Sequence, residues 1–424
     1  MRSFRFMMFG FLQLSLLLSL AACSWKKQEE DLRIGDRVLV QVPFALNGQY
    51  SLKIVELFTL TNLTELKGLA AQFLMDPDSV SGALRGRSPR IRYIRNEEGV
   101  IIPKDDLSLQ LLTMYAHLEK LRNLDTAAGA EGVATWPTTV AVNAKYRDAN
   151  GNSENNAIFS GKYDALLMVP YTQQALPVMA NGGVVGHEHF HALFYKLVIQ
   201  PLKDLYPEVV ASVPHRESRL EEKFGLESAS DSGPERNPGH TVNEKDLRKQ
   251  YHAIVLGGIN EGLADVWGWI FTGDVDLVGR SLPSEKYNRK LDLYGENLKL
   301  SSTMDIRLAP QYNKYQLGTQ VARSLQHFAY VAMEQRKLSL PETRLLMAKW
   351  LIATLPTLRE KFAALKDDEY LAPSEILNLF SAQVQGESYA ECSDLASRIP
   401  EDDQKKLATE RCESFNVQDV QDKS

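Results

Sequence analysis

The chain has 424 residues, of which 44% are hydrophobic, 24% charged and 9% aromatic, a composition typical of soluble globular proteins that excludes a disordered or fibrous chain. At about 150 residues per domain, the length predicts two or three structural units. The net charge of −6 argues against a nucleic-acid partner, because such proteins usually carry a basic patch or stripe.

Residues 1–22 have the features of an export signal. Arg2 and Arg5 give a cationic start, and residues 7–20 form an apolar stretch that is too short to be a stable transmembrane helix. The stretch ends in Leu-Ala-Ala-Cys, which resembles the lipobox of bacterial lipoproteins. This resemblance implies a lipoprotein signal peptide whose removal leaves Cys23 as the acylated N-terminus. The alternative is an ordinary secretory signal followed by a chance cysteine.

Residues 23–36 are predicted to be a solvated tether, because charged side chains crowd this segment. We therefore expect an exported protein, anchored by lipid to the bacterial cell envelope, and Ser24 fits the sorting pattern for the outer membrane. Loss of Arg2 and Arg5 with the signal would make the mature chain more acidic still. An acidic surface gives no polybasic second membrane signal, so the lipid would have to hold the protein at the membrane.

An N-terminal lobe that contains strands and helices is predicted over residues 37–200. Helical periodicity predicts a helix over residues 107–124. A turn-rich run at 148–153 leads into a predicted hairpin. The patterns that predict strands, including the two arms of this hairpin, lie at residues 38–42, 138–145, 157–159 and 165–169.

A polar, charged stretch over residues 214–240 predicts a surface insertion or loop, which we assign to residues 201–249. Thr241 and Glu244 have the spacing of a capping box, which predicts that regular structure resumes there. Residues 250–424 are predicted to form a helical C-terminal lobe. Its helical patterns lie at residues 316–333, 343–361 and 375–384.

Cys392 and Cys412 are the two cysteines outside the signal region. Export to an oxidising compartment favours a disulfide between them. The alternative is two unpaired thiols near the C-terminus.

The strongest functional signal is His-Glu-x-x-His at residues 187–191, whose apolar flanks predict a central buried helix. Histidines four residues apart share a helical face, so His187 and His191 can reach one metal ion while Glu188 faces a water on that ion. His189 points nearly the opposite way and is not expected to be a ligand. The alternative is that these are core histidines with satisfied hydrogen bonds.

A second segment, residues 259–270, has apolar residues on one helical face, with Glu261 and Asp265 on the opposite face. One carboxylate could complete an open three-ligand zinc site, and the other could accept the free ring N–H of a ligating histidine. By itself this helix would be read as having a solvated acidic face. Beside the histidine motif, the metal interpretation is favoured.

These two segments resemble the gluzincin metallopeptidases of the thermolysin and fungalysin kind. The resemblance implies that His187, His191 and Glu261 bind Zn²⁺, that Glu188 is the general base, and that Asp265 orients a histidine. It also implies an α+β, zincin-like fold with two lobes: a β-containing N-terminal lobe and a mostly helical C-terminal lobe.

The resemblance extends less specifically to Asn156 and Ala157, which stand where the family has an edge strand that pairs with the substrate backbone. The family also has a histidine shortly before a glycine that opens a C-terminal helix, and Tyr315 stands at that place here. A phenol can donate a hydrogen bond to a developing oxyanion, although Tyr315 could equally be an ordinary aromatic residue. His327 and His252 are alternative donors without a supporting motif.

The expected function is zinc-dependent hydrolysis of peptide bonds in a peptide or protein substrate, by a metal-bound water that Glu188 activates. Two other functions remain open at this point. One is a catalytically silent envelope lipoprotein that keeps the fold as a binding module. The other is a zinc hydrolase that acts on a non-peptide amide.

Overall fold

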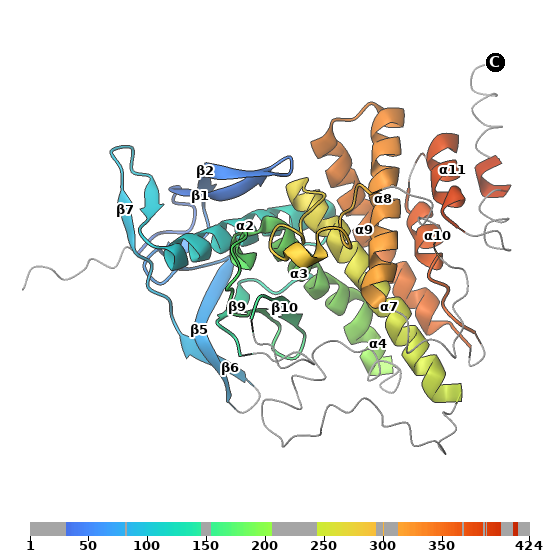
Figure 1. Ribbon diagram of the computed structural model, residues 1–424, viewed down its shortest axis with the longest axis horizontal. Helices are drawn as coiled ribbons and strands as arrows, with labels where there is room; N and C mark the ends of the chain where they lie inside the picture. Colours follow the sequence, from blue (N-terminus) through green and yellow to red (C-terminus); the bar gives the residue numbers. More distant parts are fainter. Residues whose placement is uncertain are drawn as a thin grey trace, which may run out of the picture.

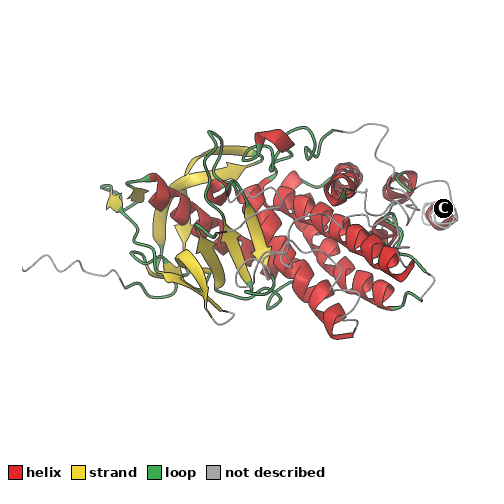
Figure 2. Cartoon of the chain, turned by 60° about the horizontal axis from the view of Figure 1, so that its bottom comes forward, coloured by secondary structure: helices red, strands yellow, loops and turns green. Residues whose placement is uncertain are grey.

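The computed structural model describes residues 31–80, 83–145, 154–205, 244–293, 300, 313–366, 369–384, 386, 388–399 and 410–413. In these residues strands gather at one end of the molecule and helices at the other (Figures 1 and 2). The predicted α+β class and the order of its two parts are confirmed. The export signal, Cys23 and residues 214–240 lie outside the described residues.

The strands form two larger sheets and one small one. A four-stranded sheet has the order β2-β1-β8-β7, a five-stranded sheet has the order β10-β11-β9-β5-β6, and β3 pairs with β4. The strands are β1 (Val38–Leu46), β2 (Gln49–Leu57), β3 (Leu60–Asn62), β4 (Lys67–Gly68), β5 (Ala71–Val80), β6 (Ala83–Arg87), β7 (Tyr93–Arg95), β8 (Ile101–Pro103), β9 (Thr138–Val142), β10 (Ala157–Ser160) and β11 (Ala165–Met168).

Helix α2 (Asp106–Ala128) packs between these sheets, where it contacts β1, β2 and β8 on one side and β5 on the other. Its start is fixed because the Asp105 side chain accepts a hydrogen bond from the Ser108 N–H. Its end is fixed by Gly129, whose φ of 83° is the left-handed conformation that terminates helices. The helix buries Leu112, Met114 and Leu118 completely, so it forms the centre of the N-terminal core.

The remaining helices form the second half of the molecule, and α7 passes through its middle, in contact with α3, α8 and α9 (Figure 1). The π-helical turn η2 directly follows α3. The elements are η1 (Val178–Ala180), α3 (Gly182–Phe194), η2 (Tyr195–Ile199), α4 (Gln200–Leu205), α7 (Glu244–Thr272), η3 (Pro283–Glu285), α8 (Lys314–Arg336), α9 (Leu340–Ala363), α10 (Glu375–Ser381) and α11 (Tyr389–Ser397).

Three sequence expectations need correction. The tether does not extend to residue 36. The Leu32 N–H already donates to Thr61 O at 2.9 Å, and the Leu32 side chain packs against the core. The segment 201–249 is helical at both ends, which belong to α4 and α7. The strand expected over 138–145 ends at Val142, because Asn143 takes a positive φ of 59°. Of the predicted capping box, Glu244 begins α7 and Thr241 lies outside the described residues.

Cys392 of α11 and Cys412 are joined by a disulfide, and both are buried. Ala396 packs against the two cysteines, and the three residues form a small separate core. Within the described part of the chain, none of the helices combines the length and the apolar character needed to cross a bilayer.

Candidate metal centre

The N-terminus of α3 is fixed by Asn181. Its Oδ1 accepts hydrogen bonds from Gly183 N–H at 3.0 Å and from the Tyr50 hydroxyl at 2.7 Å. Its amide group donates to Leu277 O at 2.7 Å and to Ser281 Oγ at 2.8 Å. Because Asn181 is completely buried, this cap sets the position of the helix that carries the histidine motif.

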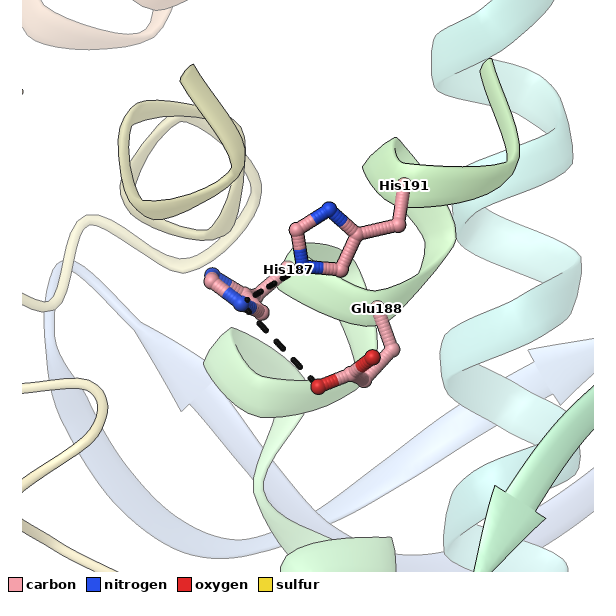
Figure 3. A group of neighbouring side chains, drawn as sticks. All are labelled: His187, Glu188 and His191. Atoms are coloured by element: carbon pink, nitrogen blue, oxygen red, sulfur yellow. Dashed lines mark hydrogen bonds and ion pairs between the residues drawn. The ribbon is translucent and has the colours of Figure 1, made fainter. Parts of the chain in front are cut away.

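Two helices bring three ligand-type atoms to one point. His187 Nε2 and His191 Nε2 of α3 lie 3.0 Å apart, and Figure 3 shows both rings on the same side of the helix. Glu261 Oε2 of α7 lies 3.5 Å from His187 Nε2 and 3.9 Å from His191 Nε2. Glu188 Oε1 is 4.0 Å from His187 Nε2, and the group formed by His187, Glu188 and His191 could hold a metal ion.

The outer nitrogen of each histidine faces an oxygen acceptor. His187 Nδ1 lies 2.9 Å from Asp265 Oδ1, and His191 Nδ1 lies 3.0 Å from Asn260 Oδ1. With a proton on each Nδ1, both Nε2 lone pairs would point at the shared space between the rings. Two lone pairs that face each other at this distance would favour a cation between them.

The surroundings shift the pKa values of the two histidines in opposite directions. Burial would lower the pKa of His187, but hydrogen bonds to Asp265 and Glu261 raise it to about 9. Burial and the neighbouring charge of His187 lower the pKa of His191 to about 3. Metal binding needs both rings without a proton on Nε2, so it would compete with protonation of His187.

Glu261 is buried, so the interpretation of its helix as a solvated acidic face is wrong. Lys314 Nζ lies 2.8 Å from Glu261 Oε1. Arg289 Nη2 lies 3.5 Å from Glu261 Oε2 and donates to Asp265 Oδ1 at 2.7 Å. Burial would raise the pKa of Glu261, but the charges of Lys314, His191 and Arg289, with a hydrogen bond to His187, hold it well below its usual value.

Glu188 is positioned by a strand. Its Oε2 accepts a hydrogen bond from the Phe159 N–H of β10 at 2.8 Å. His189, on the opposite side of α3, lies 2.9 Å from an oxygen of the buried Asp125 of α2 and is not part of the metal group. The side chain of His189 therefore points away from the metal group.

Glycines allow α3, α7 and α8 to approach closely. A Cβ atom at Gly268 of α7 would lie 2.5 Å from Gly183 O of α3, and one at Gly262 would lie 2.4 Å from Gly318 O of α8. Larger residues at these positions would force the helices apart. Because Glu261 and Asp265 lie beside these contacts, the glycines set the distance between the carboxylates and the histidines.

A cavity of about 1120 Å³ opens above the metal group. It lies between β10, the segment that follows α7, and the start of α8, and it includes Asn156, Ala157 and Tyr315. β10 is the edge strand of its sheet. Val169 N–H donates to Asn156 O at 3.1 Å, so alternate main-chain groups face β11, and those of Ala157 and Phe159 face away from it.

Tyr315 lies in the first turn of α8, between two cations. The Arg289 guanidinium is 5.2 Å and the Lys314 ammonium 4.9 Å from the centre of its ring. The alternative donors do not line this cavity: His252 packs against Phe362 and Tyr370, and His327 lies 3.1 Å from Asp394.

The structure thus brings His187, His191, Glu188, Glu261 and Asp265 together, as the two motifs predict. Sequence analysis missed Asn260, Lys314 and Arg289. Asn260 directly precedes Glu261, and an amide at this place could have been considered as a partner for the second histidine. Lys314 and Arg289 had no recognisable signal, because loops and other helices separate them from the motifs. Comparison of the chain with models of known protein families, and with curated proteins, gives no match.

Proposed function

We propose that this chain is a zinc-dependent peptidase. The observation that carries the proposal is the pair of facing Nε2 atoms of His187 and His191, each oriented by an acceptor on its Nδ1, with the Glu261 carboxylate as a third donor atom. Satisfied core histidines would not need two lone pairs directed at each other.

The donor set favours zinc among the divalent metals. Two imidazoles and one carboxylate are a common set for a catalytic zinc ion, which keeps its fourth position open. Ligand atoms of a tetrahedral zinc ion stand about 3.3 Å apart. The three distances here, 3.0, 3.5 and 3.9 Å, are close to that spacing.

Glu188 would serve as the proton carrier. A bound zinc ion would supply a water of lowered pKa and polarise the substrate carbonyl. Glu188 lies beside the histidines without being needed as a third ligand, since Glu261 fills that role. Its carboxylate would take the proton of the attacking water and deliver it to the leaving amine, while the Phe159 N–H holds it in place.

The cavity supports a peptide as substrate. The outward carbonyl of Ala157 could accept a hydrogen bond from an extended segment, in the manner of an added strand. The Ala157 N–H donates to Asn156 Oδ1 at 2.9 Å, and a substrate carbonyl would take the place of this side chain. Tyr315 is the proposed oxyanion donor. The Arg289 and Lys314 side chains against its ring favour a fixed orientation.

The export signal and the lipobox-like sequence support a lipid-anchored protein of the bacterial envelope, which would meet peptides or proteins outside the cytoplasm. The zincin-like fold remains part of this proposal. Its support is the order of the elements: an edge strand, a histidine helix and a later carboxylate helix around one cavity.

The test uses the chain from Ser24, which contains every described residue. Zinc content and cleavage of casein are measured for the wild type, for Glu188→Gln and for Glu360→Gln, a matched change at an exposed carboxylate of α9. We expect stoichiometric zinc in all three proteins, and cleavage lowered by at least about a thousandfold in Glu188→Gln alone.

Zinc in every protein without cleavage in any of them would favour the binding module or a hydrolase of non-peptide amides. The absence of bound zinc after incubation with zinc salts would contradict the metal site itself.

A further inference from the structure

The four-stranded sheet has one face that nothing in the described part of the chain covers. Val40, Val55 and Ile101 are buried on its inner face, against α2. Their neighbours along each strand point the other way. The outward residues are therefore Ile54 on β2, Gln41 on β1, Ile102 on β8 and Ile94 on β7.

The pairing register places these outward residues in a row. Ile54 pairs with Gln41, Ile102 pairs with Ile94, and the adjacent residues Val40 and Ile101 pair across β1 and β8. The row thus crosses all four strands, and Leu52 opposite Pro43 extends it. We call Leu52, Ile54, Ile94 and Ile102 the outer apolar face; the exposed fractions of the first three are 61, 53 and 45%.

This exposure is unusual within the molecule. Among the described residues, every exposed Ile, Leu or Phe side chain except Leu293 lies between residues 34 and 107. Exposed apolar surface that gathers on one face marks an interaction site more often than scattered exposure does.

Cations border this face. Arg92 and Lys104 follow the same alternation as Ile94 and Ile102 and are exposed. Arg90, two residues before Arg92, is exposed as well. Arg92 also lies 3.6 Å from Asp105. The cations are a local border of this face, because residues 31–106 as a whole carry ten basic and ten acidic residues.

The chain enters the fold next to the end of β2, at the small sheet formed by β3 and β4. Asp31 bridges to Asn62, and Gly35 N–H donates to Phe58 O at the end of β2. Cys23 lies eight residues before Asp31, a separation of about 28 Å at full extension. A lipid on Cys23 would therefore keep this end of the molecule close to the membrane.

We propose that the outer apolar face, with its bordering cations, docks on an anionic phospholipid surface. The isoleucine and leucine side chains enter the interface, and Arg90, Arg92 and Lys104 lie among the headgroups. The metal cavity lies on the other side of α2, next to β10, so that docking leaves it open to substrate.

The test again uses the chain from Ser24, which lacks any lipid. Sedimentation with vesicles of phosphatidylcholine, or of equimolar phosphatidylcholine and phosphatidylglycerol, measures binding. One variant combines Leu52→Ser, Ile54→Ser and Ile94→Ser, and another combines Arg90→Gln, Arg92→Gln and Lys104→Gln. Tyr389→Ser, a change of similar exposure on α11, is the control.

We expect the wild type and the control to bind the mixed vesicles, and each triple variant to bind them at least about tenfold more weakly, since each cation contributes roughly fivefold. Equal binding to neutral vesicles, equal binding by the triple variants, or no binding by the wild type would each overturn the proposal. Because the substituted side chains are exposed, zinc content and thermal melting verify that the variants are folded.

Discussion

Asn260 orients one of the two histidines at the metal centre, just as Asp265 orients the other. Its Oδ1 faces His191 Nδ1 at 3.0 Å, and the residue is buried. An amide accepts this proton without adding charge, whereas a second carboxylate would add to Glu261 and Asp265. The use of one charged acceptor, Asp265, and one neutral acceptor, Asn260, therefore limits the negative charge next to the two histidines.

Asn260→Ala would leave His191 without this partner and free its ring to change tautomer. We expect zinc affinity to fall about 10- to 100-fold, measured by competition with a chromogenic chelator. Asn260→Asp retains an acceptor oxygen and is expected to recover much of the affinity. Wild-type affinity in the alanine variant would contradict this role.

His117 of α2 gives the protein a defined acid sensitivity. Burial against Phe44, Phe271 and Gly182 lowers its pKa from 6.5 to about 4. Above pH 6.5 the ring is neutral in both the folded and the unfolded chain. Between pH 6.5 and 4 only the unfolded chain takes up the proton, so that the free energy of unfolding falls with decreasing pH, by up to about 3 kcal/mol.

His117→Gln removes this titration. We expect the unfolding free energy, measured in urea at pH 7 and at pH 4.5, to fall less with acid in the variant than in the wild type. His252, whose pKa burial also lowers to about 4, contributes equally to both proteins. An identical loss in both would show that His117 takes up its proton without unfolding.

At the scale of elements, α7 is held between α3 and α8 by contacts without side chains. Gly268→Ala would place a methyl group 2.5 Å from Gly183 O. We expect the free energy of unfolding to fall by about 1–3 kcal/mol and zinc affinity to fall as well, since Asp265 and Glu261 move with the helix. Denaturant unfolding and chelator competition measure the two effects.

Gly257→Ala is the matched control on the same helix. Its Cβ would meet nothing closer than Lys314 Cδ at 3.4 Å, and alanine favours a helix by up to about 1 kcal/mol over glycine. Stability should therefore be unchanged or higher. A similar loss in both variants would mean that any methyl group in α7 is harmful, whatever its contacts.

The helices were more predictable than the strands. α2, α8 and α9 have clear periodicity, and the two motif helices have their chemistry as well. Seven strands, β2 to β8, lie between residues 49 and 103, where sequence analysis predicted none. In β1 it predicted residues 38–42 and missed the end of the strand. The reason is visible in β2, where Leu52 and Ile54 are exposed while Val55 and Leu57 are buried. Apolar residues on both faces remove the alternation from which a strand is recognised.

The same limit applies to the site. His187, His191 and Glu261 follow from spacing within two helices. The ion pairs of Arg289 and Lys314 depend on how a loop and a third helix return to α7, and residue patterns along the chain carry no information about that return. The register of β10 against β11, which directs Ala157 toward the cavity, is likewise a property of the assembled sheet.

At the scale of the whole molecule, the disulfide closes the C-terminal part of the chain onto the helical half, where α11 contacts α8 and α10. Replacing Cys392 and Cys412 by alanine opens a loop with a sequence separation of 20. We expect a loss of about 3 kcal/mol in the free energy of unfolding in the loop-entropy picture, with zinc content unchanged. Loss of zinc would show that this region supports the metal centre directly.

The position of β10 has a consequence for which proteins could serve as targets. Its outer edge, where no strand is paired, lies in a cavity beside the metal group, and only a chain with unpaired main-chain groups could join it. A natively folded target has already used those groups in its own sheets and helices. The rate of attack on such a target would follow the fraction of time that a segment spends locally unfolded, so that the conformational stability of the target, more than its sequence, would decide whether it is degraded.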